Sequence, residues 1–425
     1  GKKKNNTDNM SLKLRLITMN FFQFFVWGAW MITIGNYWFG TKHWASEDFG
    51  IIFSTMGISS IFMPALCGMI ADRWINSERL YGILHILYGI TFISLPVVDD
   101  PVTFFWVILL GMIFYMPSLA LSYSIAYSSL NKANLDTVKH FPPIRVWGTV
   151  GFIAAMWLTN LTGNKASENQ FYIAGVSAIL LGLYAFSLPA APPQNTAGKG
   201  RTLAQILGLE AFKLFKDRKM ALFFLFSIFL GAALQLTNAY GDVFLDDFKY
   251  AYPDSFVVRY STIILSISQV SEIVFILAIP FFLKRFGIKA VILTSMLAWV
   301  FRFGLFAFSN PEGGLWMIIL SCIVYGMAFD FFNISGSLFV DKSTSPKIRS
   351  SAQGLFIMMA NGFGAVLGSW TSGIIIGKFF TAADGMKDWQ SIWLCFAGYV
   401  MVLAILFAIF FKHNEVTEKE KQTAH

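Results

Sequence analysis

Charged residues are scarce in this chain of 425 residues, because Asp, Glu, Lys and Arg together make up only 13% of it. Soluble globular proteins carry about 25%. Apolar residues make up 56%, with 45 Phe and 13 Trp among the aromatic ones, which is more than one core can bury. The composition excludes a soluble protein and indicates an integral membrane protein.

Cysteine and catalytic motifs are also missing or rare. The three cysteines, Cys67, Cys322 and Cys395, lie far apart in apolar runs, so we expect small buried side chains and neither disulfides nor a thiolate metal site. The chain lacks the metalloprotease, serine-hydrolase, P-loop and dinucleotide-binding signatures. We therefore predict that it is not an enzyme, that it needs no metal or organic cofactor, and that an ion gradient supplies its energy.

Apolar runs long enough to cross a hydrocarbon core of about 30 Å occur twelve times. They cover 14–41, 49–71, 79–97, 102–130, 142–161, 170–188, 219–247, 256–283, 289–309, 313–340, 349–380 and 388–412. The chain thus predicts a tail at 1–13 that is disordered before Met10, a bundle at 14–188, a linker with an amphipathic helix at 189–218, a bundle at 219–412 and a tail at 413–425.

The basic residues predict the orientation of these spans, since Lys and Arg are retained in cytoplasmic loops. Most of the 32 Lys and Arg residues fall at the two ends and in the even-numbered gaps, and the opposite side has only Lys42, Lys165, Lys249, Arg259, Lys378 and Lys387. Both termini are therefore expected in the cytoplasm. The net charge of +8 is a topology signal and does not predict nucleic-acid binding.

The two halves repeat each other at a spacing of about 210 residues, as duplicated transporter bundles do. Residues 142–145 match 346–349, Asp72-Arg73 match Lys284-Arg285, and Tyr115 matches Tyr325. The segment Gly68-Met-Ile-Ala-Asp72-Arg73 resembles the Gly-x-x-x-Asp-Arg signature of the major facilitator superfamily, although its usual basic continuation is absent. The resemblance implies an all-α membrane protein of twelve transmembrane helices in two pseudo-symmetric six-helix bundles. It also implies a gating role for Gly68, Asp72 and Arg73.

Polar residues in the middle of the second-half spans are costly and need a reason. They form three pairs with i, i+3 spacing, each on one helix face: Gln235 with Asn238, Gln269 with Glu272, and Asp330 with Asn333. Interhelical clasps are one reading. A shared water-filled cavity that binds a solute explains three pairs at one depth more simply, with the carboxylates open to water.

The first half contributes Arg145, with Thr149 and Phe152 on the same helix face, although Arg145 could also be a cytoplasmic topology charge. Phe329 beside Asp330 can supply stacking surface. Arg302, alone in its span, is expected to pair with a carboxylate or to extend toward the membrane surface. Carboxylates, amides and aromatic planes fit nucleosides or sugars, and composition alone does not separate the two.

Four longer motifs resemble the nucleoside:proton symporters of this superfamily. They are Phe-Pro-Pro-Ile-Arg-x-Trp-Gly-Thr at 141–149, Leu-Gln-x-Thr-Asn at 234–238, Ser-Ile-Ser-Gln-x-Ser-Glu at 266–272 and Phe-Asp-Phe-Phe-Asn-Ile-Ser-Gly-Ser at 329–337. The resemblance implies that Gln235, Asn238, Gln269 and Glu272 bind nucleoside with Arg145, Thr149 and Phe152, and that Asp330 is needed for transport. We add Phe329 and Asn333 to the binding set.

These observations predict proton-coupled nucleoside uptake by alternating access, with the substrate at the midplane between the bundles. Asp330 is expected to carry the proton and Glu272 to accept from the ribose, although the two roles could be exchanged. The expected partners are a nucleoside such as uridine or adenosine, protons and the lipid bilayer. We expect a multi-pass monomer in the bacterial cytoplasmic membrane. A sugar:proton symporter, a multidrug exporter and a membrane receptor or enzyme remain as alternatives.

Overall fold

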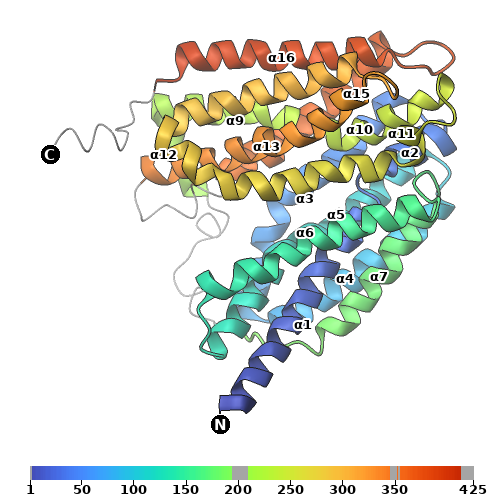
Figure 1. The fold of residues 1–425 in the computed structure, drawn as a ribbon. Coiled ribbons are helices and arrows are strands. Elements are labelled where there is room, and N and C mark those ends of the chain that lie inside the picture. Colours follow the sequence, from blue (N-terminus) through green and yellow to red (C-terminus); the bar gives the residue numbers. More distant parts are fainter. Residues whose placement is uncertain (1, 194–208, 345–351, 353–354, 413–425) are drawn as a thin grey trace. The chain divides into compact units, whose positions relative to one another are not determined.

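The computed structural model describes residues 2–193, 209–344, 352 and 355–412 (Figure 1). The regular elements in these ranges are helices, and one isolated β-bridge joins Thr381 to Lys387. The chain divides into an N-terminal unit, Gly1–Trp44 with Ile58–Leu207, and a C-terminal unit, Ala45–Gly57 with Gly208–His425. The all-helical membrane fold predicted from the composition is confirmed.

The N-terminal unit contains α1 to α7. Their bounds are α1 Lys2–Gly28, α2 Ile34–Asn36, the π-helix η1 Tyr37–Thr41, α3 Ser46–Arg73, α4 Ser77–Ser94, the 3-10 turn η2 Leu95–Val97, α5 Pro101–Lys132, α6 Thr137–Leu161 and α7 Asn169–Ala185. The first turns of α3, up to Gly57, belong to the C-terminal unit. Because α1 begins at Lys2, the expectation of a disordered segment before Met10 is wrong.

The C-terminal unit contains the remaining helices. Their bounds are the 3-10 helix η3 Leu209–Lys216, α9 Arg218–Leu234, α10 Leu236–Asp247, η4 Phe248–Tyr250, α11 Phe256–Arg259, α12 Ser261–Phe308, α13 Leu315–Ser343, the π-helix η6 Met358–Gly364, α15 Ala365–Phe379 and α16 Trp389–Phe410. Of the predicted linker, 194–208 lie outside the described residues, as do the tail at 413–425 and Pro346–Arg349 of the repeat.

Seven helices of the described ranges are long and apolar enough to cross a membrane. One of them, α12, covers two predicted spans over 48 residues and bends at Gly287, whose φ of 83° favours glycine. The other crossings are α1, α6, the 17-residue α7, and η6 with α15. Charged and polar side chains lower the mean hydropathy of α1 and α6, α7 is short, and the change from π-helix to α-helix divides the crossing formed by η6 and α15.

Two predicted spans are broken near their middle. The first changes from α1 to α2 across Ala29–Thr33, and the hydroxyls of Thr33 and Thr159 donate to the Ala29 carbonyl that the break leaves free (3.4 and 3.1 Å). The seventh breaks at Gln235, between α9 and α10. Inside a membrane, a broken helix is tolerated where side chains satisfy the backbone, and such breaks commonly form transporter binding sites.

In the N-terminal unit α1 packs along α6, and α4 packs along α7 (Figure 1). One buried apolar cluster joins Leu16 and Met19 of α1 to Tyr81 and Leu84 of α4 and to Ile125 of α5. The contact of α1 with α6 depends on glycine. A Cβ atom at Gly151 would lie 2.0 Å from the backbone oxygen of Phe21, closer than real Cβ contacts allow.

We expect Gly151→Val to prevent correct folding, because two backbones would have to separate along the contact of α1 with α6, and overpacking by even a methylene or two costs about 1–3 kcal/mol. The measurement is the monodisperse fraction in size-exclusion chromatography after mild detergent extraction. Gly398→Val is the control, since nothing lies within 4 Å of a Cβ at that helical position. Equal monodisperse fractions for the two variants would contradict the prediction.

Candidate functional site

Arg145 of α6 is half-buried in the N-terminal unit and is held by aromatic side chains. Its Nε donates to the Tyr123 hydroxyl at 3.2 Å, and its guanidinium carbon lies 4.1 Å from the ring centroid of Phe24. No ion pair with Arg145 occurs among the described residues. Because its neighbours are neutral, the cation keeps donors available for the oxygens of a ligand.

The aromatic surface around Arg145 continues through Trp27 to Phe152. The Trp27 ring lies 6.2 Å from Phe152 at 90° and 5.4 Å from Tyr115, and Phe152 is buried. Thr149 is half-buried one turn after Arg145. The structure thus places the three predicted residues on one helix and adds Phe24 and Trp27, which we did not predict as functional.

A buried polar network beneath this surface is centred on Gln23 of α1. The Gln23 amide oxygen accepts from the Tyr81 hydroxyl at 2.5 Å and lies 2.9 Å from Nε2 of His85, while its amide nitrogen donates to Ser118 at 3.0 Å. The Tyr115 hydroxyl donates to the Gln23 backbone oxygen at 2.7 Å. These bonds fix the positions of α1, α4 and α5, and within the described residues Nδ1 of His85 is the ring nitrogen left without a partner. The signal that could have predicted this network is Gln23, one of three amides in the first apolar run, with Asn20 and Asn36.

In the C-terminal unit, the break between α9 and α10 brings two predicted amides together. Nδ2 of Asn238 donates to Oε1 of Gln235 at 3.3 Å, and both side chains are half-buried. Gln269 and Glu272 of α12 are also half-buried. The amides therefore retain further donors and acceptors for a solute.

Asp330 of α13 lies deeper than we expected, because it is only 2% exposed. Its Oδ2 atom has no hydrogen-bond partner among the residues that the structure describes, and its carboxyl group lies near that of Glu272. The expectation that both carboxylates are open to water is therefore wrong for Asp330 in this structure. A buried carboxyl group without a cation is least costly as the neutral acid, so this geometry suits a residue that carries a proton.

Phe329 and Asn333 flank Asp330. The Phe329 ring stacks on Tyr325 with centroids 5.7 Å apart and an interplanar angle of 15°. Asn333 donates from Nδ2 to the Phe329 backbone oxygen at 2.9 Å, which leaves its amide oxygen as an acceptor. The Tyr325 hydroxyl lies near the Asn238 amide and near the carboxyl groups of Glu272 and Asp330. Tyr325 thus links three helices that carry predicted residues, and we did not predict it as part of the site.

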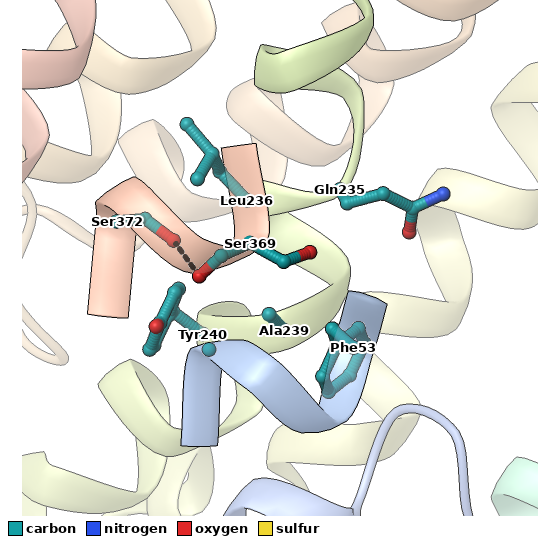
Figure 2. Close-up of a pocket in the computed structure, with 8 residues that line it drawn as sticks. Phe53, Gln235, Leu236, Ala239, Tyr240, Ser369 and Ser372 are labelled. Carbon is teal, nitrogen blue, oxygen red and sulfur yellow. Dashed lines mark hydrogen bonds between the residues drawn. The ribbon is translucent and has the colours of Figure 1, made fainter. Parts of the chain in front are cut away.

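A small recess lies beside the break between α9 and α10, and Figure 2 shows its lining. It is lined by Gly50, Phe53, Gln235, Leu236, Ala239, Tyr240, Ser369 and Ser372. In Figure 2 the Gln235 amide extends away from Ser369 and Tyr240, and Ser372 donates to the Ser369 backbone oxygen at 3.2 Å. Gln235 is the one predicted residue in the lining, so we do not identify this recess with the predicted binding site.

The predicted gating residues lie at the end of α3. Among the described residues nothing lies within 4 Å of a Cβ atom placed at Gly68, so this glycine makes no close helix contact there. The side chains of Asp72 and Arg73 lie outside the described residues. Cys67 and Cys322 are buried, whereas Cys395 is exposed, so the expectation of three buried thiols is wrong for Cys395 on the outer face of α16.

The described residues contain no cluster of three or more His, Cys, Asp or Glu side chains that could hold a metal ion. The titratable groups brought together are Glu272, Asp330 and Tyr325, together with the buried cation Arg302. Their carboxyl and amide neighbours can bind hydroxyls and ring nitrogens and can accept a proton. The arrangement suits reversible binding of a polar solute.

Comparison with known proteins agrees with this chemistry. A family model described as nucleoside H+ symporter matches residues 10–416. The xanthosine permease of Escherichia coli is 50% identical over 418 residues, which cover 98% of this chain and 99% of the relative. The nucleoside permease NupG of Escherichia coli is 46% identical over 410 residues, covering 96% and 97%.

Solved structures of the nucleoside transporter NupG are also similar to this chain. A crystal structure of a mutant of the nucleoside transporter NupG superimposes with a TM-score of 0.92 at 46% identity, covering 94% of this chain and 100% of that chain. A bacterial homologue of the lysosomal transporter Spinster, at 14% identity and a TM-score of 0.64, shares the fold. The relatives are transporters. This chain belongs to the nucleoside:proton symporter family, within the major facilitator fold.

Proposed function

We propose that this protein takes up nucleosides together with protons across the bacterial cytoplasmic membrane. The observation that carries the proposal is the polar group of the C-terminal unit. At the helix break Asn238 donates a hydrogen bond to Gln235. Tyr325 lies near Asn238 and near the carboxyl groups of Glu272 and Asp330. Such a group of amides and carboxyls inside apolar helices is expensive unless it binds a solute or a proton.

Ribose hydroxyls both donate and accept, so carboxylates and amides recognise them in combination. In our proposal Glu272 accepts from the ribose, while Gln235, Asn238, Gln269 and Asn333 complete the polar contacts. Phe329 supplies a surface for the base. Arg145, Thr149 and Phe152 of the N-terminal unit bind the same molecule from the other bundle, at the depth of the midplane.

Asp330 is proposed to carry the proton. A neutral Asp330 allows the loaded protein to change its opening from one side of the membrane to the other, and release of the proton into the less acidic cytoplasm drives accumulation. The bundles at 14–188 and 219–412 move against each other in this alternating access. Gly68, Asp72 and Arg73 are proposed to form part of the cytoplasmic gate. We place both termini in the cytoplasm, on the charge distribution, and take the monomer as the transporting form.

Purified protein in liposomes is expected to accumulate radiolabelled uridine when the outside is made more acidic. One pH unit is worth about 1.4 kcal/mol per proton, so one-to-one coupling supports about tenfold accumulation. A protonophore should abolish accumulation but permit exchange of internal for external uridine. Excess disaccharide should not compete. Saturable uptake of the disaccharide driven by the pH difference, with no saturable uridine uptake, would show that the sugar symporter alternative is right.

A further inference from the structure

Arg302 is a buried cation in the second half of α12. It is only 2% exposed, and it has no ion pair in the parts of the chain that the structure describes. One Nη atom donates to the backbone oxygen of Ser321 at 2.8 Å and lies 3.5 Å from the Ser268 hydroxyl, while Nε has no partner within the described ranges. The expectation of a carboxylate partner or of extension to the membrane surface is wrong. A charge kept at this depth without a counter-ion needs another reason.

Two aromatic rings lie close to this cation. The guanidinium carbon lies 4.9 Å from the centroid of Phe306 and 4.8 Å from that of Tyr325. Tyr325 in turn stacks on Phe329. The attraction of a cation for the ring face is strongest when both are removed from water, as they are here. Arg302 therefore fixes the plane of Tyr325, and through it that of Phe329.

The hydroxyl end of Tyr325 meets the polar group of the proposed nucleoside site. It lies near the Asn238 amide and near the carboxyl groups of Glu272 and Asp330. A cation on the ring face draws electron density from the ring, which makes the phenolic O–H a stronger donor toward a carboxylate. The other titratable group beside Arg302 is the buried thiol of Cys322.

We propose that Arg302 is a positioning residue of the nucleoside site, which acts on the substrate only through Tyr325. It holds the Tyr325 ring and strengthens its hydroxyl as a donor to the Asn238 and Glu272 side of the site. The proposal rests on the proposed function. It explains why an unpaired cation is kept beside two aromatic rings rather than replaced by an apolar side chain.

The test measures KM and Vmax for uridine uptake in liposomes for a double-mutant cycle. Arg302→Met is expected to raise KM about tenfold, with Vmax changed less than about twofold, and Tyr325→Phe to raise KM similarly. Combining the two should add nothing further, because both break the same link. Arg302→Lys, which keeps the cation, should restore most of the affinity. Arg302→Gln, a neutral side chain that still donates to the Ser321 carbonyl, should behave like Arg302→Met.

Ser321→Ala is the matched control. It removes the bond from the Ser321 hydroxyl to the Arg302 backbone oxygen at 3.0 Å, at the same helix contact, without touching the charge. Its KM should equal that of the unaltered protein. The melting temperature of Arg302→Met distinguishes a positioning role from a structural one. A positioning role predicts an unchanged melting temperature, because the substitution removes a buried charge that has no counter-ion.

The proposal is overturned if Arg302→Met leaves KM unchanged, if its effect adds fully to that of Tyr325→Phe, or if it lowers only the melting temperature and Vmax. In each of these cases saturable uridine uptake by the unaltered protein would leave the proposed function standing. Absence of uridine uptake by the unaltered protein would instead overturn the proposed function and this inference together.

Discussion

Asp330→Asn should abolish uphill accumulation of uridine while leaving exchange of uridine across the membrane. The unaltered protein is expected to reach about tenfold accumulation at one pH unit, and the variant should stop at equal concentrations inside and outside. Asparagine has nearly the same shape as a neutral aspartic acid but cannot release a proton. Because Asp330 is 2% exposed with no partner for Oδ2, the neutral amide should fit without a new cavity.

Two measurements are needed for this prediction. Accumulation is followed with an acidic exterior, and counterflow is followed with equal pH and a high internal concentration of unlabelled uridine. Asp254→Asn makes the same chemical change at an exposed position and should accumulate normally. Continued uphill transport by Asp330→Asn would assign the proton to another group, with Glu272 as the first candidate because its charge interacts with that of Asp330.

The helical architecture could be predicted from hydropathy because lipid imposes a length and a composition on every crossing. The helix breaks could not. At the break after Gly28, the Ala29 carbonyl accepts from the hydroxyl of Thr159, which lies 130 residues further along the chain. The stability of this break therefore depends on a contact that no local pattern contains. The break at Gln235 likewise falls inside a span, 219–247, whose hydropathy predicts one continuous helix. Hydropathy averages over such features, although they determine where polar side chains point.

The candidate site was predictable where helix geometry alone decides it. Gln235 and Asn238 were expected on one face from their spacing, and the structure places them in hydrogen-bond contact. Phe24 and Tyr325 could not be predicted as site residues. The chain has 45 Phe and 14 Tyr, and nothing in the sequence distinguishes these two from the others. The partners of Arg302 were mispredicted for a related reason. An isolated cation suggests a carboxylate, whereas packing supplied a carbonyl and two rings.

Glu272→Gln should weaken uridine binding by about 10- to 100-fold, since a hydrogen bond to a charged group contributes about 1.5–3 kcal/mol. The glutamine side chain has the same length, but one of its two acceptor oxygens becomes a donor, so a ribose hydroxyl loses a partner and meets a competing N–H group. Glu272 is half-buried, whereas Asp330 is buried, so Glu272 is the carboxylate that a solute can reach.

Isothermal titration calorimetry in detergent measures this loss without dependence on the proton gradient. The decisive comparison uses 2′,3′-dideoxyuridine, which lacks the ribose hydroxyls that Glu272 is proposed to bind. The substitution should cost much less affinity for this analogue than for uridine, because the interaction that it removes is already missing. Glu312→Gln, the same change in an exposed loop, should bind both ligands normally. An equal loss for uridine and the dideoxy analogue would place Glu272 against the 5′-hydroxyl, against the base or in the support of the helices, and the 2′- and 3′-hydroxyls would then need a different acceptor among the polar groups of α10 and α13.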